Sequence, residues 1–269
     1  MEIIGYIASL AIGISLGLIG GGGSILTVPV LVYLFKVDVV PATAYSLFIV
    51  GATSLVGSIP KYRAGEINIR TAIIFGIPSI AAVYATRAFI VPAIPKVIFQ
   101  AGSFTVTKSL LMMTLFAVLM VFASVSMIRD KKQATEESDE QKFNYPLILL
   151  EGAIVGMLTG LVGAGGGFLI IPALVLLSKL PMKQAVGTSL LIIAAKSLIG
   201  FTGDLGKMNM DWTLLLSVTG LAIAGIFIGN MLGKKVSPVK LKKGFGWFVL
   251  VMGIYIIIQV LFFPIGGKH

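Results

Sequence analysis

The chain of 269 residues is 57% hydrophobic and 12% charged, with a mean hydropathy of +1.02. Soluble globular proteins carry charge on about a quarter of their residues, so this composition indicates an integral membrane protein. The chain has no cysteine and one histidine, His269, which excludes disulfides, Cys/His metal sites and histidine catalysis within the membrane. The net charge of +10 comes from basic residues in short loops, which membrane lipid and topology explain more simply than nucleic acid.

Apolar segments recur along the whole chain, five in each half. They lie near residues 3–19, 24–36, 41–59, 70–91 and 108–128, and then near residues 147–162, 167–178, 183–203, 212–232 and 244–263. They do not alternate polar and apolar residues as barrel strands do, so they predict an all-α integral membrane protein. Some approach the ~20 residues that a tilted helix needs to cross the bilayer. The first segment lacks a basic n-region, so we expect it to remain in the mature protein.

A charged stretch separates the two halves. The sequence RDKKQATEESDEQK at 129–142 contains no large apolar side chain, which is typical of a solvated linker. The predicted organisation is a first membrane repeat at 1–128, a cytoplasmic linker at 129–145 and a second membrane repeat at 146–269.

The two halves share motifs at one constant offset, the separation of Gly17 from Gly160. GLIGGGGSILTVP at 17–29 corresponds to GLVGAGGGFLIIP at 160–172, and ATAYSL at 42–47 corresponds to AVGTSL at 185–190. The register at this repeat offset holds without a gap for about fifty residues, which indicates an internal duplication. Because each half has five segments, an odd number, the second repeat is predicted to have inverted topology.

The charge of the loops tests whether each half crosses the membrane an odd number of times, which we call its parity. If every segment changes sides, most lysines and arginines collect on one face, as the positive-inside rule requires. The loop charges therefore predict a multi-pass protein of the cell (cytoplasmic) membrane, with a cytoplasmic linker and both termini outside. The short, Gly/Pro-interrupted second and seventh segments either cross the membrane or form re-entrant hairpins with the segments before them, since both arrangements have the same parity.

The two glycine runs are candidates for a binding site. Glycine lets the backbone adopt positive φ and lets another group approach it closely. We expect the helix after each run to begin near Pro29 or Pro172, leaving backbone N–H groups that attract an anion. Short interrupted segments at matching positions of inverted halves also mark transporter sites. The alternative is that the glycines only permit close helix packing, and a nucleotide loop is not supported because no Gly-Lys-Ser/Thr follows.

Polar side chains beyond the runs extend the candidate site. The hydroxyls of Tyr45, Ser46, Thr188 and Ser189 can donate to an oxyanion or can bond back to a helical carbonyl. Lys196, within a span, is either the fixed positive charge for a substrate anion or a residue that snorkels to the outer surface.

Other ionisable residues receive weaker assignments. Glu151 can carry a coupling proton or pair with Lys196, or it is an interfacial residue favoured by the helix dipole. Arg87 and Asp204 lie near segment ends, where we expect them to anchor or guide rather than bind.

The predicted substrate-binding residues lie in the runs or in the third segment of each half. They are Gly20, Gly21, Gly22, Gly23, Ser24, Tyr45, Ser46, Gly163, Gly165, Gly166, Gly167, Thr188, Ser189 and Lys196. No metal and no cofactor are predicted.

The paired runs, each followed by Ala-x-x-x-Ser-Leu, resemble the TauE/SafE sulfite exporter family over nearly the whole chain. The resemblance implies secondary transport of small sulfur-containing anions such as sulfite, thiosulfate or organosulfonates, commonly out of the cell and coupled to the proton gradient. Tyr45 and Ser24 depart from the pattern of the second half, where Thr188 and Gly167 stand. The family's motif positions fall on Gly20, Gly22, Gly23, Pro29, Ser46, Gly163, Gly165, Gly166, Gly167, Pro172, Thr188 and Ser189, and they include neither Lys196 nor Glu151.

The sequence therefore predicts a secondary carrier that moves a small anion by alternating access, as two inverted halves rock around a midplane site. The alternatives are a passive anion channel with the same backbone site and a carrier of another small anion. A membrane enzyme is disfavoured because the spans hold no histidine, cysteine or paired carboxylates. The expected partners are a small anionic substrate and membrane lipid, and no nucleic acid.

Overall fold

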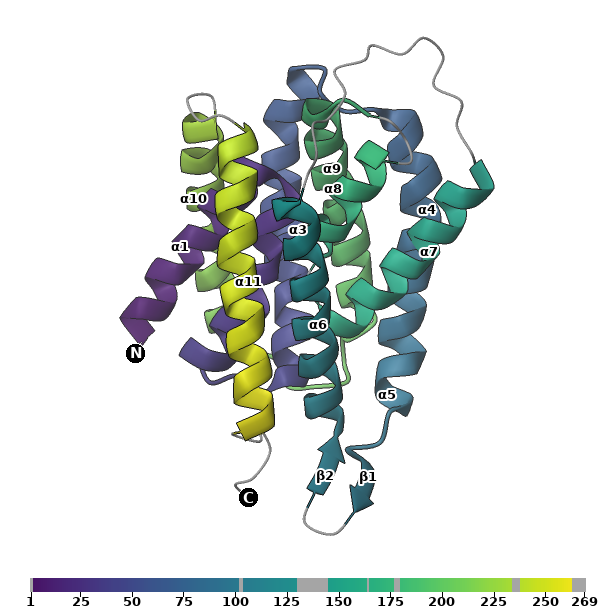
Figure 1. Ribbon diagram of the computed structural model, residues 1–269, viewed down its shortest axis with the longest axis vertical. Coiled ribbons are helices and arrows are strands. Elements are labelled where there is room, and N and C mark those ends of the chain that lie inside the picture. Colours follow the sequence, from purple (N-terminus) through teal and green to yellow (C-terminus); the bar gives the residue numbers. More distant parts are fainter. Residues whose placement is uncertain are drawn as a thin grey trace.

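The computed structural model describes residues 2–101, 104–129, 145–163, 165–176, 180–233 and 238–262 (Figure 1). Within these ranges the protein is a bundle of helices with one short β-hairpin. Of the predicted linker at 129–145, residues 130–144 lie outside the described residues.

The first half contains the hairpin and several interrupted helices. Its elements are α1 (Glu2–Ile19), η1 (Gly21–Leu26), α2 (Thr27–Pro29), η2 (Val30–Leu34), α3 (Val39–Arg63), α4 (Ile69–Ala85), η3 (Thr86–Ile90), α5 (Val91–Ala93), β1 (Val97–Ala101), β2 (Phe104–Thr107) and α6 (Lys108–Ile128). The second half is built from α7 (Tyr145–Val162), α8 (Gly167–Leu176), α9 (Met182–Thr202), α10 (Trp212–Gly233) and α11 (Pro238–Phe262). Each predicted apolar segment thus has a helical counterpart.

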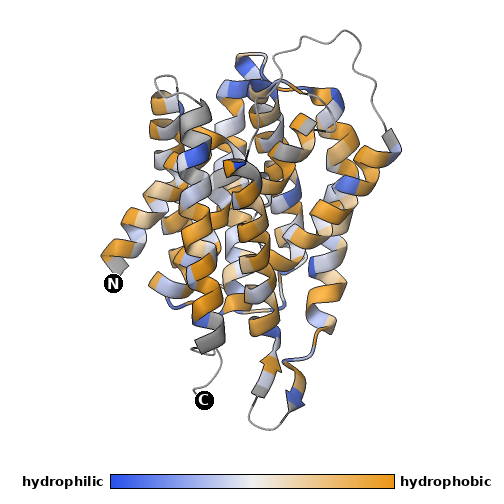
Figure 2. Cartoon of the chain, in the orientation of Figure 1, coloured by the Kyte–Doolittle hydropathy of each residue, from blue (hydrophilic) through white to orange (hydrophobic). Residues whose placement is uncertain are grey.

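Five helical stretches in the described part of the chain are long and apolar enough to cross a membrane. They are Val39–Arg63, Ile69–Ala93, Lys108–Val125, Met182–Thr202 and Trp212–Gly233. Figure 2 shows hydrophilic residues concentrated toward the two ends of the bundle, with mostly apolar helix bodies between them. These features agree with the predicted all-α membrane protein.

The β-hairpin is an element that the sequence interpretation did not include. Strands β1 and β2 pair antiparallel between the end of α5 and the start of α6, at one end of the bundle (Figure 1). The Thr107 side chain then accepts a hydrogen bond from the Leu110 N–H and so caps α6. The hairpin therefore connects two spans outside their apolar bodies.

The expectation that helices begin near Pro29 and Pro172 is wrong. Helical backbone starts at Gly21 in the first half and at Gly167 in the second, and it continues through both prolines. Proline removes a backbone donor from a helix, and local changes of helical pitch can absorb that loss. In the first half such changes flank Pro29, because η1 is wound more tightly and η2 more loosely than an α-helix.

Helices from opposite halves pack against each other. Helix α1 packs on α10, α7 packs on α4, α3 packs on α9, and α6 packs on α11. At the repeat offset, α1 corresponds to α7 and α4 corresponds to α10. The first two contacts are therefore equivalent, with the halves exchanged.

Glycine contacts repeat this exchange residue by residue. A Cβ at Gly13 would overlap the carbonyl of Ala222, and a Cβ at Gly156 would overlap the carbonyl of Ser79. The repeat offset relates Gly13 to Gly156, and it also relates Ser79 to Ala222. The same relation links the contact of Gly57 with Ile226 to the contact of Gly200 with Val83. The duplicated sequence therefore makes duplicated contacts between its halves.

Candidate functional site

The two glycine runs meet in the interior of the bundle. A Cβ added to Gly21 would overlap the Cα of Gly167, and a Cβ added to Gly167 would overlap the Cα of Gly21. The backbones of η1 and the start of α8 are therefore in direct contact, and side chains have no room there. The two runs, which the sequence proposes as parts of a binding site, are thus in contact in the structure.

Several glycines of the runs also need their backbone freedom. Gly20, Gly163, Gly165 and Gly166 have φ of 75°, 73°, 62° and 72°, a conformation that other residues rarely adopt. Consecutive left-handed residues at 165 and 166 turn the chain into α8. The glycines therefore serve both a tight backbone turn and a close approach.

The turn at Gly165 and Gly166 faces side chains from four helices, the nearest to Gly165 being Val50 of α3. A Cβ at Gly165 would lie 3.2 Å from the Ser24 Cβ, and a Cβ at Gly166 would lie 2.8 Å from the Lys196 Nζ. The same position at Gly166 is bounded by Thr159 of α7. The absence of a side chain at 166 thus leaves space for the lysine head group beside the runs.

Lys196 is completely buried in the protein rather than extended to its surface. Its Nζ donates a hydrogen bond to the Thr159 Oγ1 at 2.9 Å. No carboxylate lies within ion-pair distance of Lys196 among the residues that the structure describes. This buried ammonium group therefore has a hydroxyl partner but no counterion there, an expensive arrangement inside a membrane protein.

Four buried hydroxyls of α3 and α9 have no hydrogen-bond partner within the described part of the chain: Ser46, Thr53, Ser54 and Ser197. Gly51 marks the crossing of these helices, because its Cβ would lie 2.9 Å from the Leu198 Cγ. Thr53, Ser54, Lys196 and Ser197 are each within three residues of these two positions, which is about 5 Å along a helix axis. Unpaired buried hydroxyls are costly, so this region is short of acceptors.

Thr53 and Ser54 correspond at the repeat offset to Lys196 and Ser197. That the hydroxyls of Thr53, Ser54 and Ser197 have no partner among the described residues could be found only from the packed structure.

Two of the predicted hydroxyls accept hydrogen bonds from the opposite half of the chain. Tyr45 Oη accepts from the Asp211 N–H at 2.6 Å, and Thr188 Oγ1 accepts from the Asn68 N–H at 2.9 Å. These contacts are equivalent, since Tyr45 corresponds to Thr188 and Asn68 to Asp211. Each hydroxyl still has its own proton to donate. Their role as anion donors stays a prediction.

Ser189 adopts the back-bonded alternative that the sequence left open, and Ser24 of the first run makes the same kind of bond. Ser189 Oγ donates to the Val186 carbonyl at 2.8 Å, and Ser24 Oγ donates to the Gly21 carbonyl at 2.7 Å. Both are bonds back to the helical backbone, and they commit the hydroxyl protons of these residues. Either serine would have to rotate to donate to an anion.

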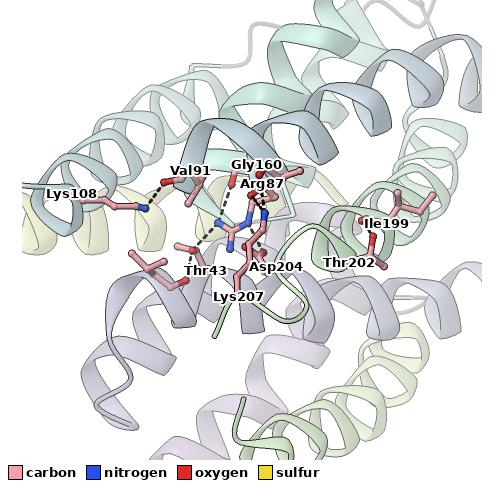
Figure 3. A network of polar contacts seen from close by, with 11 residues as sticks. Thr43, Arg87, Val91, Lys108, Gly160, Ile199, Thr202, Asp204 and Lys207 are labelled. Carbon is pink, nitrogen blue, oxygen red and sulfur yellow. Dashed lines mark hydrogen bonds and ion pairs between the residues drawn. The ribbon is translucent and has the colours of Figure 1, made fainter. Parts of the chain in front are cut away.

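Arg87 of η3 forms a second polar centre, with partners from α3, α7 and the loop after α9 (Figure 3). Its Nε donates to Asp204 Oδ2 at 2.6 Å, and its Nη1 donates to Thr43 Oγ1 at 3.0 Å and to the Gly160 carbonyl at 3.2 Å. Arg87 and Asp204 are buried, so this ion pair joins the two halves inside the bundle. The sequence interpretation expected both residues near segment ends but missed their pairing across 117 positions.

Two lysines complete this network at the end of the bundle (Figure 3). Lys207 Nζ donates to the Ala88 carbonyl at 2.8 Å, and Lys108 Nζ donates to the Val91 carbonyl. Burial raises the pKa of the Asp204 carboxyl, which lies in the loop after α9, while the Arg87 guanidinium opposes that rise. The pair thus neutralises charge where α4 ends and α9 turns toward α10.

Glu151 lies apart from these centres. It is half-buried on α7, eight residues before Thr159, and therefore about 12 Å away along the helix axis. Of the three predicted roles of Glu151, the ion pair with Lys196 does not occur in the described residues. Its role in proton coupling stays a prediction.

Known proteins are similar to this chain over most of its length. The sulfite exporter TauE/SafE family matches residues 6–256. A probable membrane transporter protein of Xylella fastidiosa (strain 9a5c) is 31% identical over 253 residues, which cover 91% of each chain. The probable membrane transporter protein YunE of Bacillus subtilis (strain 168) is 27% identical over 256 residues, 90% of this chain and 89% of its own. No solved structure matches the chain significantly.

Proposed function

Because this chain belongs to the sulfite exporter TauE/SafE family, we propose that it is a secondary transporter that exports small sulfur-containing anions such as sulfite, thiosulfate or organosulfonates. Its relatives are named as probable membrane transporters, and its long apolar helices suit a multi-pass membrane protein. Such a transporter needs an anion site in the protein interior, reached in turn from each side.

The observation that carries the proposal is the buried Lys196 Nζ beside the meeting point of the glycine runs. The lysine supplies positive charge that no carboxylate of the described residues neutralises, and hydroxyls at the crossing of α3 with α9 have no partner among those residues. A bound anion would offset the charge and accept from those hydroxyls. Glycine backbone at the same point allows the ligand to approach the main chain.

The exchanged contacts between the halves support a pseudo-two-fold repeat, and the five predicted segments of each half support its inversion. Equivalent helices make equivalent contacts with the halves reversed, as an axis of pseudo-symmetry between them requires. The contact of Gly21 with Gly167 favours runs that meet at mid-membrane from opposite sides, as re-entrant hairpins would. We propose rocking of the halves about this contact as the motion of alternating access.

The proposed orientation is that of the cytoplasmic membrane, with the linker inside and both termini outside. It rests on the charge of the loops. Glu151 is the proposed proton carrier, because it is a half-buried carboxylate on the helix that also holds Thr159.

Flux into proteoliposomes tests the function. The purified protein is reconstituted and supplied with sulfite, thiosulfate, sulfonates, phosphate and chloride, with and without a pH gradient. We expect saturable flux of a sulfur anion, accelerated by substrate on the far side. Absence of flux for every sulfur anion would reject the substrate class, and unitary current steps would instead favour the anion channel.

A further inference from the structure

The buried charges of the described residues do not cancel. In that part of the chain the buried charged residues are Arg87, Lys196 and Asp204, with exposures of 0%, 0% and 2%. Arg87 is paired with Asp204, so these two contribute no net charge. Lys196, in its protonated form, remains as one positive charge beside Gly166, next to the contact of the two glycine runs.

The crossing of α3 with α9 adds hydroxyl donors but no second charge. Thr53, Ser54 and Ser197 lie within three residues of that crossing, they are neutral, and their hydroxyls are buried without a partner among the described residues. The position equivalent to Lys196 in the first repeat is Thr53, so the site has a charge on one side only. Hydroxyl protons can bond to the oxygens of an anion without changing the total charge.

A ligand with one negative charge would bring this site to neutrality. A dianion would leave one negative charge without a counterion in a buried region, where an uncompensated charge carries a large desolvation cost. From this we propose, on the basis of the proposed function, that the protein selects a small monoanionic sulfur oxyanion, such as a sulfonate or hydrogen sulfite, over dianions such as thiosulfate and sulfate.

A comparison of the fluxes of anions with fixed charge tests the proposal in the wild-type protein. Methanesulfonate is a monoanion and thiosulfate and sulfate are dianions throughout the neutral pH range, so proton uptake does not confuse the comparison. We expect radiolabelled methanesulfonate to enter proteoliposomes at least tenfold faster per unit concentration than either dianion. Equal or faster flux of a dianion would overturn the charge rule and leave the proposed transport function standing. Loss of flux for all sulfur anions would reject the function itself.

The duplication provides a matched set of variants. Thr53→Lys puts a second charge at the position equivalent to Lys196, and we expect it to shift the flux ratio at least tenfold toward the dianions. Thr53→Met adds similar bulk and removes the hydroxyl without adding charge, so we expect it to slow the flux of both anion classes without shifting the ratio toward the dianions. An unchanged ratio in Thr53→Lys, with the protein folded by size-exclusion chromatography, would contradict the proposal.

A further test moves the lysine from the second repeat to the first, so that the number of charges stays the same. The double variant Thr53→Lys/Lys196→Thr carries one lysine on the opposite repeat, and we expect the preference for the monoanion to persist. Lys196→Met removes the charge, and we expect it to abolish the preference. If Thr53→Lys does not fold, Lys196→Met and the wild-type flux ratio still decide the matter, since a preserved preference in Lys196→Met would refute the role of the charge.

Discussion

At the scale of single residues, the protein treats two buried cations differently. Arg87 has a carboxylate, a hydroxyl and a carbonyl as partners, whereas Lys196 has one hydroxyl among the described residues. A paired buried charge contributes to holding the halves together, and an unpaired one is available to a ligand. The role of Arg87 is therefore tested by measuring the stability of variants, and the role of Lys196 by measuring their transport.

Removing one partner of the buried ion pair should destabilise the protein strongly. Arg87→Met leaves the Asp204 carboxyl buried without its guanidinium, and we expect a loss of about 3–5 kcal/mol in the free energy of unfolding. The double variant Arg87→Met/Asp204→Leu leaves no uncompensated charge and should recover most of that loss. Chemical unfolding in detergent micelles measures both, and a single variant as stable as the wild type would contradict the importance of the pair.

At the scale of elements, the contact of η1 with α8 depends on the absence of side chains. Gly21→Ala and Gly167→Ala each insert a methyl group where the other backbone lies, so the two segments must separate. We expect each to lose about 1–3 kcal/mol of stability and most of its transport activity. Gly220→Ala in α10 is the control, because its Cβ would meet nothing within 4 Å and alanine favours a helix. Full transport by both run variants would mean that the contact is not needed for function.

The elements also differ in how well the sequence predicts them. Runs of apolar residues located all ten helical segments, with bounds that agree within six positions, because length and hydropathy are local properties. The hairpin at 97–107 was missed, since it lies outside the apolar segments. The prolines were misleading, because a helix can absorb a proline by a change of pitch that no local rule reveals.

The candidate site was predicted in part for a related reason. The phase of the two glycine runs indicated that they act together, and their contact is present in the structure. Other features of the site depend on packing between distant segments. One is the ion pair of Arg87 with Asp204. Another is the set of hydroxyls without a partner in the described part of the chain, on Thr53, Ser54 and Ser197. No pattern in the chain distinguishes such residues before the helices are packed.

At the scale of the whole molecule, inverted topology has a direct test, because the chain has no native cysteine. Ala64 lies in the exposed turn after α3, and Asn209 lies in the exposed loop after α9. We expect a membrane-impermeant maleimide to label Asn209→Cys in intact cells and to label Ala64→Cys only after permeabilisation. Labelling of both from the same side would contradict inversion of the second half.

The unequal pair of Thr53 and Lys196 has a consequence for how such a molecule can be assembled. Two identical half-length chains that associated symmetrically would have the same residue in both places, so their shared centre would contain two lysines or none. Covalent fusion of the halves removes that restriction, because each copy can then change alone. A fused chain can therefore have an odd number of charges at its centre, a number that a symmetric dimer of identical halves cannot reach.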